Sequence, residues 1–309
     1  MSYLRAFGSW LPPRRVRNAE IAPLVGATPE SILEATGIEE RRYAAEEDTV
    51  ADIGVLAAQS CLEKAGVAAA DLGMILVASG SSERFCPGPA SQVAARLRLS
   101  ATPALDIPVA SAGSLIGMAL AARLAPAVGR VLVIGAEIMS RRVTLSPEAK
   151  NTAILFGDGA GACLVDPETG FARIADSCLY TDGSQAEILA VQDRVFRMDG
   201  QAVILQAARK IPRAIGELLA RNQIGAADVE VFLLHQANLN LITRVAGALK
   251  AARERFYTNI ERYGNTSSAS MLIAADEWWR GKTAPLQGPM VLAAFGAGLN
   301  WGAVLALPA

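Results

Sequence analysis

The chain repeats a helix–strand unit at the 157-residue spacing that separates Asp71 from Asp228, and this repeat restricts its fold more than any other feature. Residues 60–79 (SCLEKAGVAAADLGMILVAS) are typical of a helix, a short link and a buried strand, and residues 217–236 (ELLARNQIGAADVEVFLLHQ) follow the same pattern. Chance matching in an alanine-rich chain is the competing explanation for any single pair. Because several matches occur in the same order, we predict an α/β protein made of two similar layered halves.

The repeat also predicts where the two halves join. The 309 residues are enough for two fused cores of about 150 residues each. The turn-forming run DPETG (166–170) marks the expected join. We therefore assign residues 1–166 to an N-terminal half and residues 167–309 to a C-terminal half.

Ser111 lies at a predicted corner between a strand and a helix. Ala104–Val109 is apolar and predicts a short buried strand, 110–114 holds only Ala, Ser and Gly, and helical spacing of apolar residues begins at Leu115. The N–H groups at the start of the helix would favour an anion there. A serine hydroxyl is a weak nucleophile without a nearby base. Two interpretations stay open: Ser111 is a nucleophile, or a small residue that lets the chain turn.

Two further polar residues are expected near Ser111. Moving Ser111 by the repeat spacing leads to Ser268, inside another run of small polar residues that opens a helix. His235, the only histidine, ends the predicted strand VEVFLLH, and such strand ends are where sites gather in α/β sheets. Asn265 either caps the following helix or points its amide into a cleft. If matched strand ends meet at a pseudo-twofold axis, Ser111 faces the elements that carry His235 and Asn265.

Composition argues against several classes of partner. The 29 basic and 30 acidic residues give no electrostatic footprint for nucleic acid, and no polybasic stretch suits an anionic membrane. The four cysteines lack CxxC spacing and, with a lone histidine, form no plausible metal set. The N-terminus lacks the apolar core of a secretory signal, so we expect a cytoplasmic protein.

Two apolar stretches resemble known motifs, a membrane helix and a nucleotide-binding loop, but each lacks features that the motif requires. Residues 288–309 are long and uncharged, but glycines, prolines and Asn300 interrupt them, which predicts two short buried strands around a tight turn rather than a membrane helix. Residues 156–165 (FGDGAGACLV) lack GxGxxG spacing and a phosphate-loop lysine. We expect that stretch to be a close-packed corner that continues as a strand.

Five motifs, taken together, resemble the β-ketoacyl-acyl carrier protein synthase III family, in that family's order and across essentially the whole chain. They are TGIEERR (36–42), ILFGDGAGA (154–162), HQAN (235–238), GNTSSAS (264–270) and AAFGAGLNWG (293–302). The resemblance implies the thiolase fold, a duplicated five-layer α/β/α/β/α arrangement that normally forms a homodimer.

The resemblance also assigns the catalytic roles. It places the family's nucleophile on Ser111 in the N-terminal half, and its histidine and asparagine on His235 and Asn265 in the C-terminal half. The nucleophile takes an acyl group from a thioester, and the other two hold the carbonyl of a malonyl thioester as it loses carbon dioxide. Backbone N–H groups of Ser111 and Ala297 would form the oxyanion hole.

Substrate contacts follow from the same resemblance. Phe85 matches an aromatic residue that reaches across the dimer to bound the partner's acyl pocket. Lys150, Gly200 and Asn238 match positions near the pantetheine arm or the nucleotide of coenzyme A. No covalently bound cofactor is expected, because acyl-CoA or the phosphopantetheine of an acyl carrier protein delivers the acyl group.

The chain departs from the family at three places. Serine stands where the nucleophile is normally cysteine, although relatives that select starter units in aromatic polyketide pathways also use serine. Ser31 and Ala35 replace the tryptophan and arginine that flank the adenine of coenzyme A, and Asn240 replaces a basic residue expected to contact the carrier protein. The first of these replacements predicts that the nucleotide binds weakly or that the acyl group arrives on a carrier protein, and Asn240 weakens the usual contact with that carrier as well.

These residues are compatible with three functions. The first is decarboxylative Claisen condensation of an acyl thioester with a malonyl thioester in fatty-acid or polyketide-type biosynthesis. The second is transfer of an acyl group to an alcohol or amine, with His235 as general base. The third is a non-condensing homologue that binds an acyl chain or a partner. The presence of Asn265 favours condensation, because plain acyl transfer has less need of a second donor to an enolate.

Overall fold

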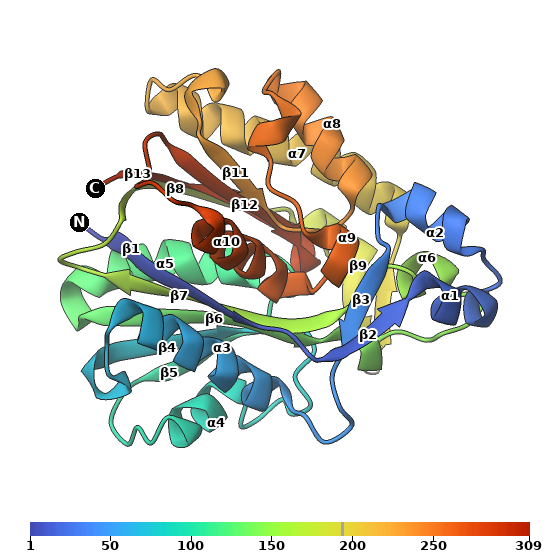
Figure 1. Ribbon diagram of the computed structural model, residues 1–309, viewed down its shortest axis with the longest axis horizontal. Helices are drawn as coiled ribbons and strands as arrows, with labels where there is room; N and C mark the ends of the chain where they lie inside the picture. The colour runs from blue at the N-terminus through green and yellow to red at the C-terminus, as the bar shows by residue number, and fades with distance from the viewer. Residues whose placement is uncertain (193–194) are drawn as a thin grey trace.

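The computed structural model describes residues 1–192 and 195–309, and a mixed nine-stranded sheet runs through them (Figure 1). The strand order is β11–β12–β13–β8–β1–β7–β6–β4–β5. Their bounds are β1 (Tyr3–Trp10), β4 (Leu72–Ala78), β5 (Ala104–Ile107), β6 (Arg130–Ile138), β7 (Asp158–Asp166), β8 (Ala172–Thr181), β11 (Val231–Leu234), β12 (Met290–Gly296) and β13 (Asn300–Pro308). Only Tyr3 and Leu4 of β1 pair with β8, so a five-strand part and a four-strand part meet at a short seam.

Helices form three layers around the two parts of the sheet, and Figure 1 shows this stacking from α4 at one side to α7 at the other. Helices α5 (Gly113–Val128) and α10 (Ser270–Gly281) lie in the middle and share one apolar core with strands of both parts. Helices α3 (Val50–Ala65) and α4 (Pro89–Arg96) cover one outer face. Helices α7 (Gly200–Arg221) and α8 (Leu239–Leu249) cover the other. The expected five-layer arrangement is confirmed.

The remaining elements form a cap beside the layers (Figure 1). Its apolar core gathers side chains from segments far apart in the sequence, among them Ile32, Phe156 and Phe196. The cap contains α1 (Asn18–Ile21), α2 (Pro29–Thr36), α6 (Lys150–Ala153), α9 (Ile260–Tyr263) and the paired strands β2 (Arg14–Arg17) with β3 (Glu40–Tyr43) and β9 (Leu189–Gln192) with β10 (Val195–Met198).

The internal repeat is present in the structure. Helix α3 leads through a 3-10 turn at Ala69–Asp71 into β4, and α7 leads through a 3-10 turn at Ala226–Asp228 into β11. The five-strand part comes from the N-terminal half, whose last strand, β7, ends at Asp166. The four-strand part comes from the C-terminal half and begins with β8.

Glycines in the central strands let helices approach the sheet closely. A Cβ added to Gly8 of β1 would collide with the backbone nitrogen of Cys61 in α3. A Cβ on Gly161 of β7 would lie 2.6 Å from the Cβ of Leu272 in α10. Residues 158–166 are wholly buried and form β7, so the glycine-rich stretch continues as a strand, as predicted.

Two other strand predictions have different outcomes. Residues 288–309 form β12 and β13, which pair antiparallel around a tight turn, as expected. The strand predicted at Ala104–Val109 is present as β5, but the prediction that it is buried is wrong. β5 pairs with β4 at the edge of the sheet, and Leu105 is 54% exposed. Within residues 1–192 and 195–309, no helix is both long and apolar enough to cross a membrane.

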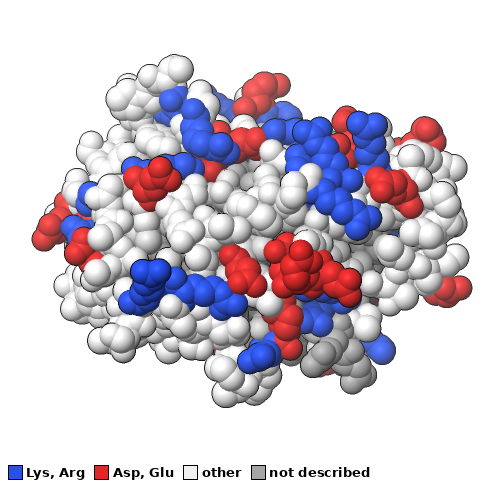
Figure 2. All heavy atoms as spheres, turned by 60° about the horizontal axis from the view of Figure 1, so that its bottom comes forward, with Lys and Arg blue, Asp and Glu red and all other residues white. Residues whose placement is uncertain are grey.

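Charge is distributed as the near-neutral composition suggests. On the face drawn in Figure 2, basic and acidic side chains form separate small groups among neutral ones, and neither sign covers the face. Several basic groups on the surface are paired, as in the contacts of Arg96 with Asp52 and of Arg262 with Glu277. This face therefore presents a mixed surface potential.

We expect Gly8→Ala to lower the free energy of unfolding by about 1–3 kcal/mol, the usual cost of overpacking, because the backbone of α3 has to move away from β1. Gly216→Ala in α7 is the matched control: its added methyl group meets nothing within 4 Å, and it should raise the free energy of unfolding by about 0.8–1.0 kcal/mol. Urea unfolding measures both. Equal stability of the two variants would contradict the proposed close approach.

Candidate active site

A cavity of about 340 Å³ lies where the two halves and the cap meet. Ser111, His235 and Asn265 all line it, although they come from three distant segments. Gly200 and Asn238 also line it, whereas Phe85, Lys150 and Ala297 do not. Most of the remaining lining is apolar and comes from α7, α8 and the cap, including Phe196, Val203, Ile204, Ile211, Leu241 and Val245.

Ser111 stands at the corner before α5 in a strained backbone conformation. Its φ is 67°, in the left-handed region that non-glycine residues seldom adopt, and the residue is 5% exposed. Its backbone N–H donates to Oγ of Ser267 at 2.9 Å, and its own Oγ lies 3.4 Å from the same oxygen. The surrounding contacts therefore fix the position of the hydroxyl at the cavity wall.

His235 directly follows β11 and is held from two sides. Its backbone N–H donates to the carbonyl of Ala293, and Nδ1 lies 2.6 Å from Oγ of Ser270. The same Oγ accepts the N–H of Gln236 at 3.0 Å. Among the described residues, the acceptor that remains for the hydroxyl proton of Ser270 is Nδ1 of His235. The ring proton is then on Nε2. Burial lowers the pKa of His235 to about 3, so the imidazole is neutral and acts as a donor.

Asn265 is oriented by its backbone and by its side-chain oxygen. Its N–H donates to the carbonyl of Leu155, and its carbonyl accepts the N–H of Gly157. Oδ1 accepts the N–H of Ser267 at 2.9 Å, so the oxygen serves the turn before α10. The nitrogen of the carboxamide is left to donate in the cavity. The two predicted roles of Asn265 therefore use different atoms: Oδ1 stabilises the turn before the helix, and the carboxamide nitrogen can donate in the cavity.

The predicted oxyanion-hole donors already have partners within the chain. The N–H of Ser111 donates to Ser267, and the N–H of Ala297 donates to the carbonyl of Ala110 at 3.2 Å. Asn238 is similarly engaged: its nitrogen donates to the carbonyl of Ala35, and its oxygen caps α8. The oxyanion role of these groups stays a prediction, and it requires the two N–H groups to exchange partners when substrate binds.

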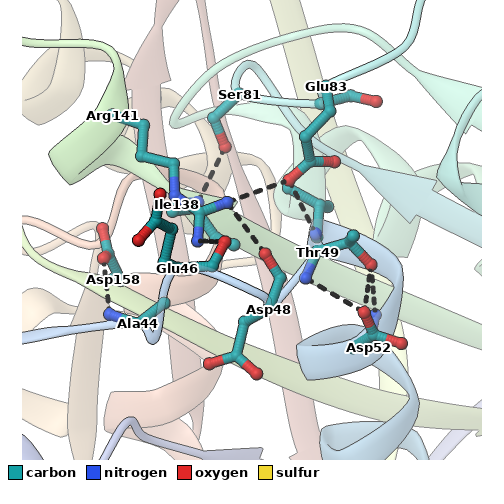
Figure 3. Close-up of polar contacts among 12 residues, drawn as sticks. Ala44, Glu46, Asp48, Thr49, Asp52, Ser81, Glu83, Ile138, Arg141 and Asp158 are labelled. Carbon is teal, nitrogen blue, oxygen red and sulfur yellow. Dashed lines mark hydrogen bonds and ion pairs between the residues drawn. The ribbon is translucent and has the colours of Figure 1, made fainter.

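Phe85 lies on a loop whose base is held firmly while its ring, 99% exposed, projects into solvent. Arg141 donates to the backbone carbonyls of Glu46 and Asp48, at 3.0 and 2.8 Å, and lies 3.9 Å from the carboxylate of Glu83 (Figure 3). Glu83 also accepts the N–H of Val50 at 3.0 Å. Phe85 is therefore presented outward and away from this chain's own cavity.

Sequence reasoning missed three residues that position the site. Ser267 contacts Ser111 and Ser270 contacts His235, whereas the roles predicted for this run belong to Asn265 alone. Glu137 is fully buried at the end of β6, and its carboxylate accepts the hydroxyl of Ser267 at 2.9 Å. The available signal was a carboxylate directly after the apolar run VLVIGA, where an unpaired charge is costly.

The cysteines stand apart from the cavity. None of the four lines it in the part of the chain that the structure describes. Cys61, Cys163 and Cys178 are buried, and burial raises the pKa of Cys61 to about 12, whereas Cys86 is exposed. The described residues also contain no group of three or more His, Cys, Asp or Glu side chains arranged to hold a metal ion.

The pH behaviour of His235 tests this geometry, and its ring signals need no assignment because it is the only histidine. We expect nuclear magnetic resonance to show a neutral ring, protonated on Nε2, from about pH 8 down to about pH 5. Below a pH of about 6.5 the unfolded chain takes up a proton that the folded chain refuses. The free energy of unfolding then falls by up to about 1.4 kcal/mol per pH unit. An imidazole that titrates near its ordinary value would contradict the closed environment, and Ser270→Ala should loosen the tautomer preference.

Comparison with known proteins supports the family resemblance over nearly the whole chain. Residues 105–183 match the family model for 3-oxoacyl-[acyl-carrier-protein] synthase III, and residues 219–307 match the model for its C-terminal part. β-Ketoacyl-[acyl-carrier-protein] synthase III of Oleidesulfovibrio alaskensis is 36% identical over 325 residues, which cover 98% of each chain. The protein of the same name from Serratia proteamaculans is 37% identical, with 96% of each chain covered.

Solved structures give the same result. The 3-oxoacyl-[acyl-carrier-protein] synthase III of Aquifex aeolicus has a TM-score of 0.95 at 31% identity, covering 99% of this chain and 100% of the other. The priming β-ketosynthase of the R1128 polyketide pathway has a TM-score of 0.91 at 30% identity, covering 100% and 96%. The chain therefore belongs to the 3-oxoacyl-[acyl-carrier-protein] synthase III family of ketosynthases and has the thiolase fold.

Proposed function

We propose that this protein is a condensing enzyme in which Ser111 carries the acyl group and His235 and Asn265 promote decarboxylative carbon–carbon bond formation. One observation carries the proposal: a single cavity holds a positioned hydroxyl beside two side chains whose free atoms are hydrogen-bond donors. The names of the relatives, β-ketoacyl-[acyl-carrier-protein] synthase III, describe the same reaction class.

In the first half-reaction, Oγ of Ser111 attacks the carbonyl carbon of an acyl thioester. The hydroxyl gives up its proton, the carbon–sulfur bond breaks, and the carrier leaves as a thiolate that takes a proton from water. The N–H groups of Ser111 and Ala297 are the proposed donors to the transient oxyanion. Serine replaces the family's usual cysteine, so the intermediate is an ester, which is less activated than a thioester.

In the second half-reaction, Nε2–H of His235 and the carboxamide N–H of Asn265 hold the carbonyl oxygen of a malonyl thioester. As carbon dioxide leaves, the electrons of the broken bond form an enolate, whose oxygen these two donors stabilise. The enolate carbon attacks the ester carbonyl, and Ser111 is released and regains a proton. A neutral imidazole suits this task because its Nε2–H donates a hydrogen bond to the enolate oxygen while the ring itself stays uncharged.

Acyl transfer to an alcohol or amine would require His235 to accept a proton at Nε2. The hydrogen bond between Ser270 and Nδ1 places the ring proton on Nε2, and burial keeps the pKa of His235 near 3. Both features oppose a general-base role. Condensation uses the imidazole in the protonation state that its surroundings favour.

The cavity lining supports an acyl or pantetheine chain as the occupant. Its walls on α7 and α8 are largely apolar, as in the group Val203, Ile204, Leu241 and Val245. Asn240 donates to the carbonyls of Glu34 and of Ala35, which lines the cavity, and so closes a contact between α8 and α2. We propose a carrier-protein thioester as donor in preference to acyl-CoA, because neither Ser31 nor Ala35 offers an adenine a stacking surface or a cation.

A homodimer is part of the proposal. Phe85 is 99% exposed on a loop with an anchored base, and Leu105 on the free edge of β5 is 54% exposed. An exposed aromatic ring and an unpaired strand edge on the same half of the molecule are typical of surface that a second copy covers.

Intact-protein mass spectrometry tests the nucleophile. With short acyl-carrier and acyl-CoA thioesters we expect an adduct that maps to Ser111, and carbon dioxide release when a malonyl thioester follows. Ser111→Ala should abolish the adduct, and Asn265→Ala should leave the adduct but slow decarboxylation by about 100-fold, as for the loss of one oxyanion donor. Adduct loss only to alcohols or amines would select acyl transfer. The absence of any adduct would select the acyl-binding homologue.

Light scattering after size-exclusion chromatography tests the homodimer. We expect a mass of about twice the 32.4 kDa of one chain. Leu105→Glu should shift the population toward the monomer, because a charge would be buried at the strand edge. Leu24→Glu is the matched control, since Leu24 is 50% exposed on the cap, away from β5. A monomer at micromolar concentration in the unaltered chain would refute this part of the proposal.

A further inference from the structure

Glu137 lies behind Ser111, fully buried at the end of β6. Its two carboxylate oxygens accept from several donors: the hydroxyls of Ser79, Ser81 and Ser267 and the backbone N–H groups of Gly80 and Ser268. In each of these contacts a carboxylate oxygen is the acceptor. The core thus holds a proton acceptor close to the site, and the condensation mechanism does not use it.

On the side of Glu137 away from the cavity, the carboxylate is held by two serine hydroxyls. Oγ of Ser81 accepts the N–H of Ile138 at 2.9 Å, a contact drawn in Figure 3, and donates to Oε2 of Glu137 at 2.5 Å. Ser79 accepts the N–H of Ser81 and donates to the same oxygen at 3.1 Å. Oε2 is therefore fixed, and Oε1 faces Ser267.

Ser267 connects Glu137 to Ser111. Its hydroxyl donates to Oε1 of Glu137 at 2.9 Å, so its oxygen is left as an acceptor toward the cavity. That oxygen accepts the backbone N–H of Ser111 at 2.9 Å and lies 3.4 Å from Oγ of Ser111. The second distance is long, but hydrogen bonds between catalytic groups tighten when substrate binds. The three groups are ordered so that a proton can pass between Ser111 and the carboxylate through the hydroxyl of Ser267.

We propose that Ser267 and Glu137 are positioning residues that relay the hydroxyl proton of Ser111 into the core. The inference rests on the proposed function, in which Ser111 is the nucleophile. As Oγ of Ser111 bonds to the thioester carbon, its proton moves to Oγ of Ser267, and the proton of Ser267 moves to Oε1 of Glu137. The carbon–sulfur bond breaks, and the carrier leaves as a thiolate that takes a proton from water. When the enolate later displaces Ser111, both protons return along the same path.

The relay meets a need that serine creates and cysteine does not. A thiol ionises appreciably near neutral pH, whereas a serine hydroxyl requires a base at the moment of attack. His235 is unsuited as that base, because the Ser270 hydroxyl donates to Nδ1 and the ring proton sits on Nε2. Ser267 is the neighbour whose oxygen contacts both the backbone and the hydroxyl of Ser111.

The decisive experiment compares single-turnover acylation in two backgrounds, the unaltered chain and Ser111→Cys. The probe is a short acyl-carrier thioester, and quenched samples are weighed by mass spectrometry. We expect Ser267→Ala to slow acylation by about 100-fold or more in the unaltered chain, the usual contribution of general-base catalysis. In the Ser111→Cys background the same change should cost only a few-fold, because a thiolate needs no relay. Glu137→Gln should show the same contrast.

Ser268→Ala is the matched control. Ser268 is a buried neighbour in the same turn, but its hydroxyl donates to the carbonyl of Val109 and not to Ser111. This control should affect the two backgrounds alike. If Ser267→Ala also slows both backgrounds by one common factor, its role is structural and the relay is wrong, while the proposed function stands. If the unaltered chain forms no adduct and Ser111→Cys does, the proposed function fails, and the relay fails with it.

A second measurement covers the case in which Ser267→Ala does not fold. Acylation of the unaltered chain is timed in mixtures of light and heavy water. A relay moves two protons together, so the rate should depend on the heavy-water fraction along a curve. Transfer to a single base moves one proton and gives a straight line, which would overturn the relay without any substitution in the network.

Discussion

The active-site region depends on one buried carboxylate, that of Glu137. A charge in this position is costly unless it is fully hydrogen-bonded, and Glu137 satisfies that requirement with groups from both halves of the chain. The 79–81 segment and β6 belong to the N-terminal half, and the turn at 267–268 belongs to the C-terminal half. Gly135 in β6 makes this meeting sterically possible, since a Cβ there would collide with the carbonyl of Ser268.

This junction explains why three distant residues share one cavity. The turn before α10 supplies Asn265, contacts Ser111 through Ser267, and orients His235 through Ser270. One short run, GNTSSAS, therefore provides one candidate catalytic side chain and positions the other two. Because the contacts to His235 and Asn265 use a hydroxyl and a backbone N–H with little freedom, these two side-chain donors are arranged before any substrate arrives.

Much of the architecture was predictable from local pattern, whereas the supporting contacts were not. The helix–strand repeat, the paired strands at 288–309 and the convergence of Ser111 with His235 and Asn265 follow from apolar spacing and the approximate symmetry of the halves. Glu137 was missed because a strand-end carboxylate is ordinarily solvated, and only its tertiary neighbours make it a buried acceptor. The exposure of Leu105 was missed because apolar composition does not distinguish an edge strand from a central one.

The sequence by itself determined the element order, the duplication, the family and the identity of the polar residues at the strand ends. These properties depend on periodicity and residue type, which act over a few neighbouring positions. The tertiary structure alone decided which hydroxyl contacts which partner, which tautomer His235 adopts, and where the N–H groups of Ser111 and Ala297 point. Hydrogen bonds depend on tenths of an ångström and on burial, and both are set only when segments far apart in the sequence pack together.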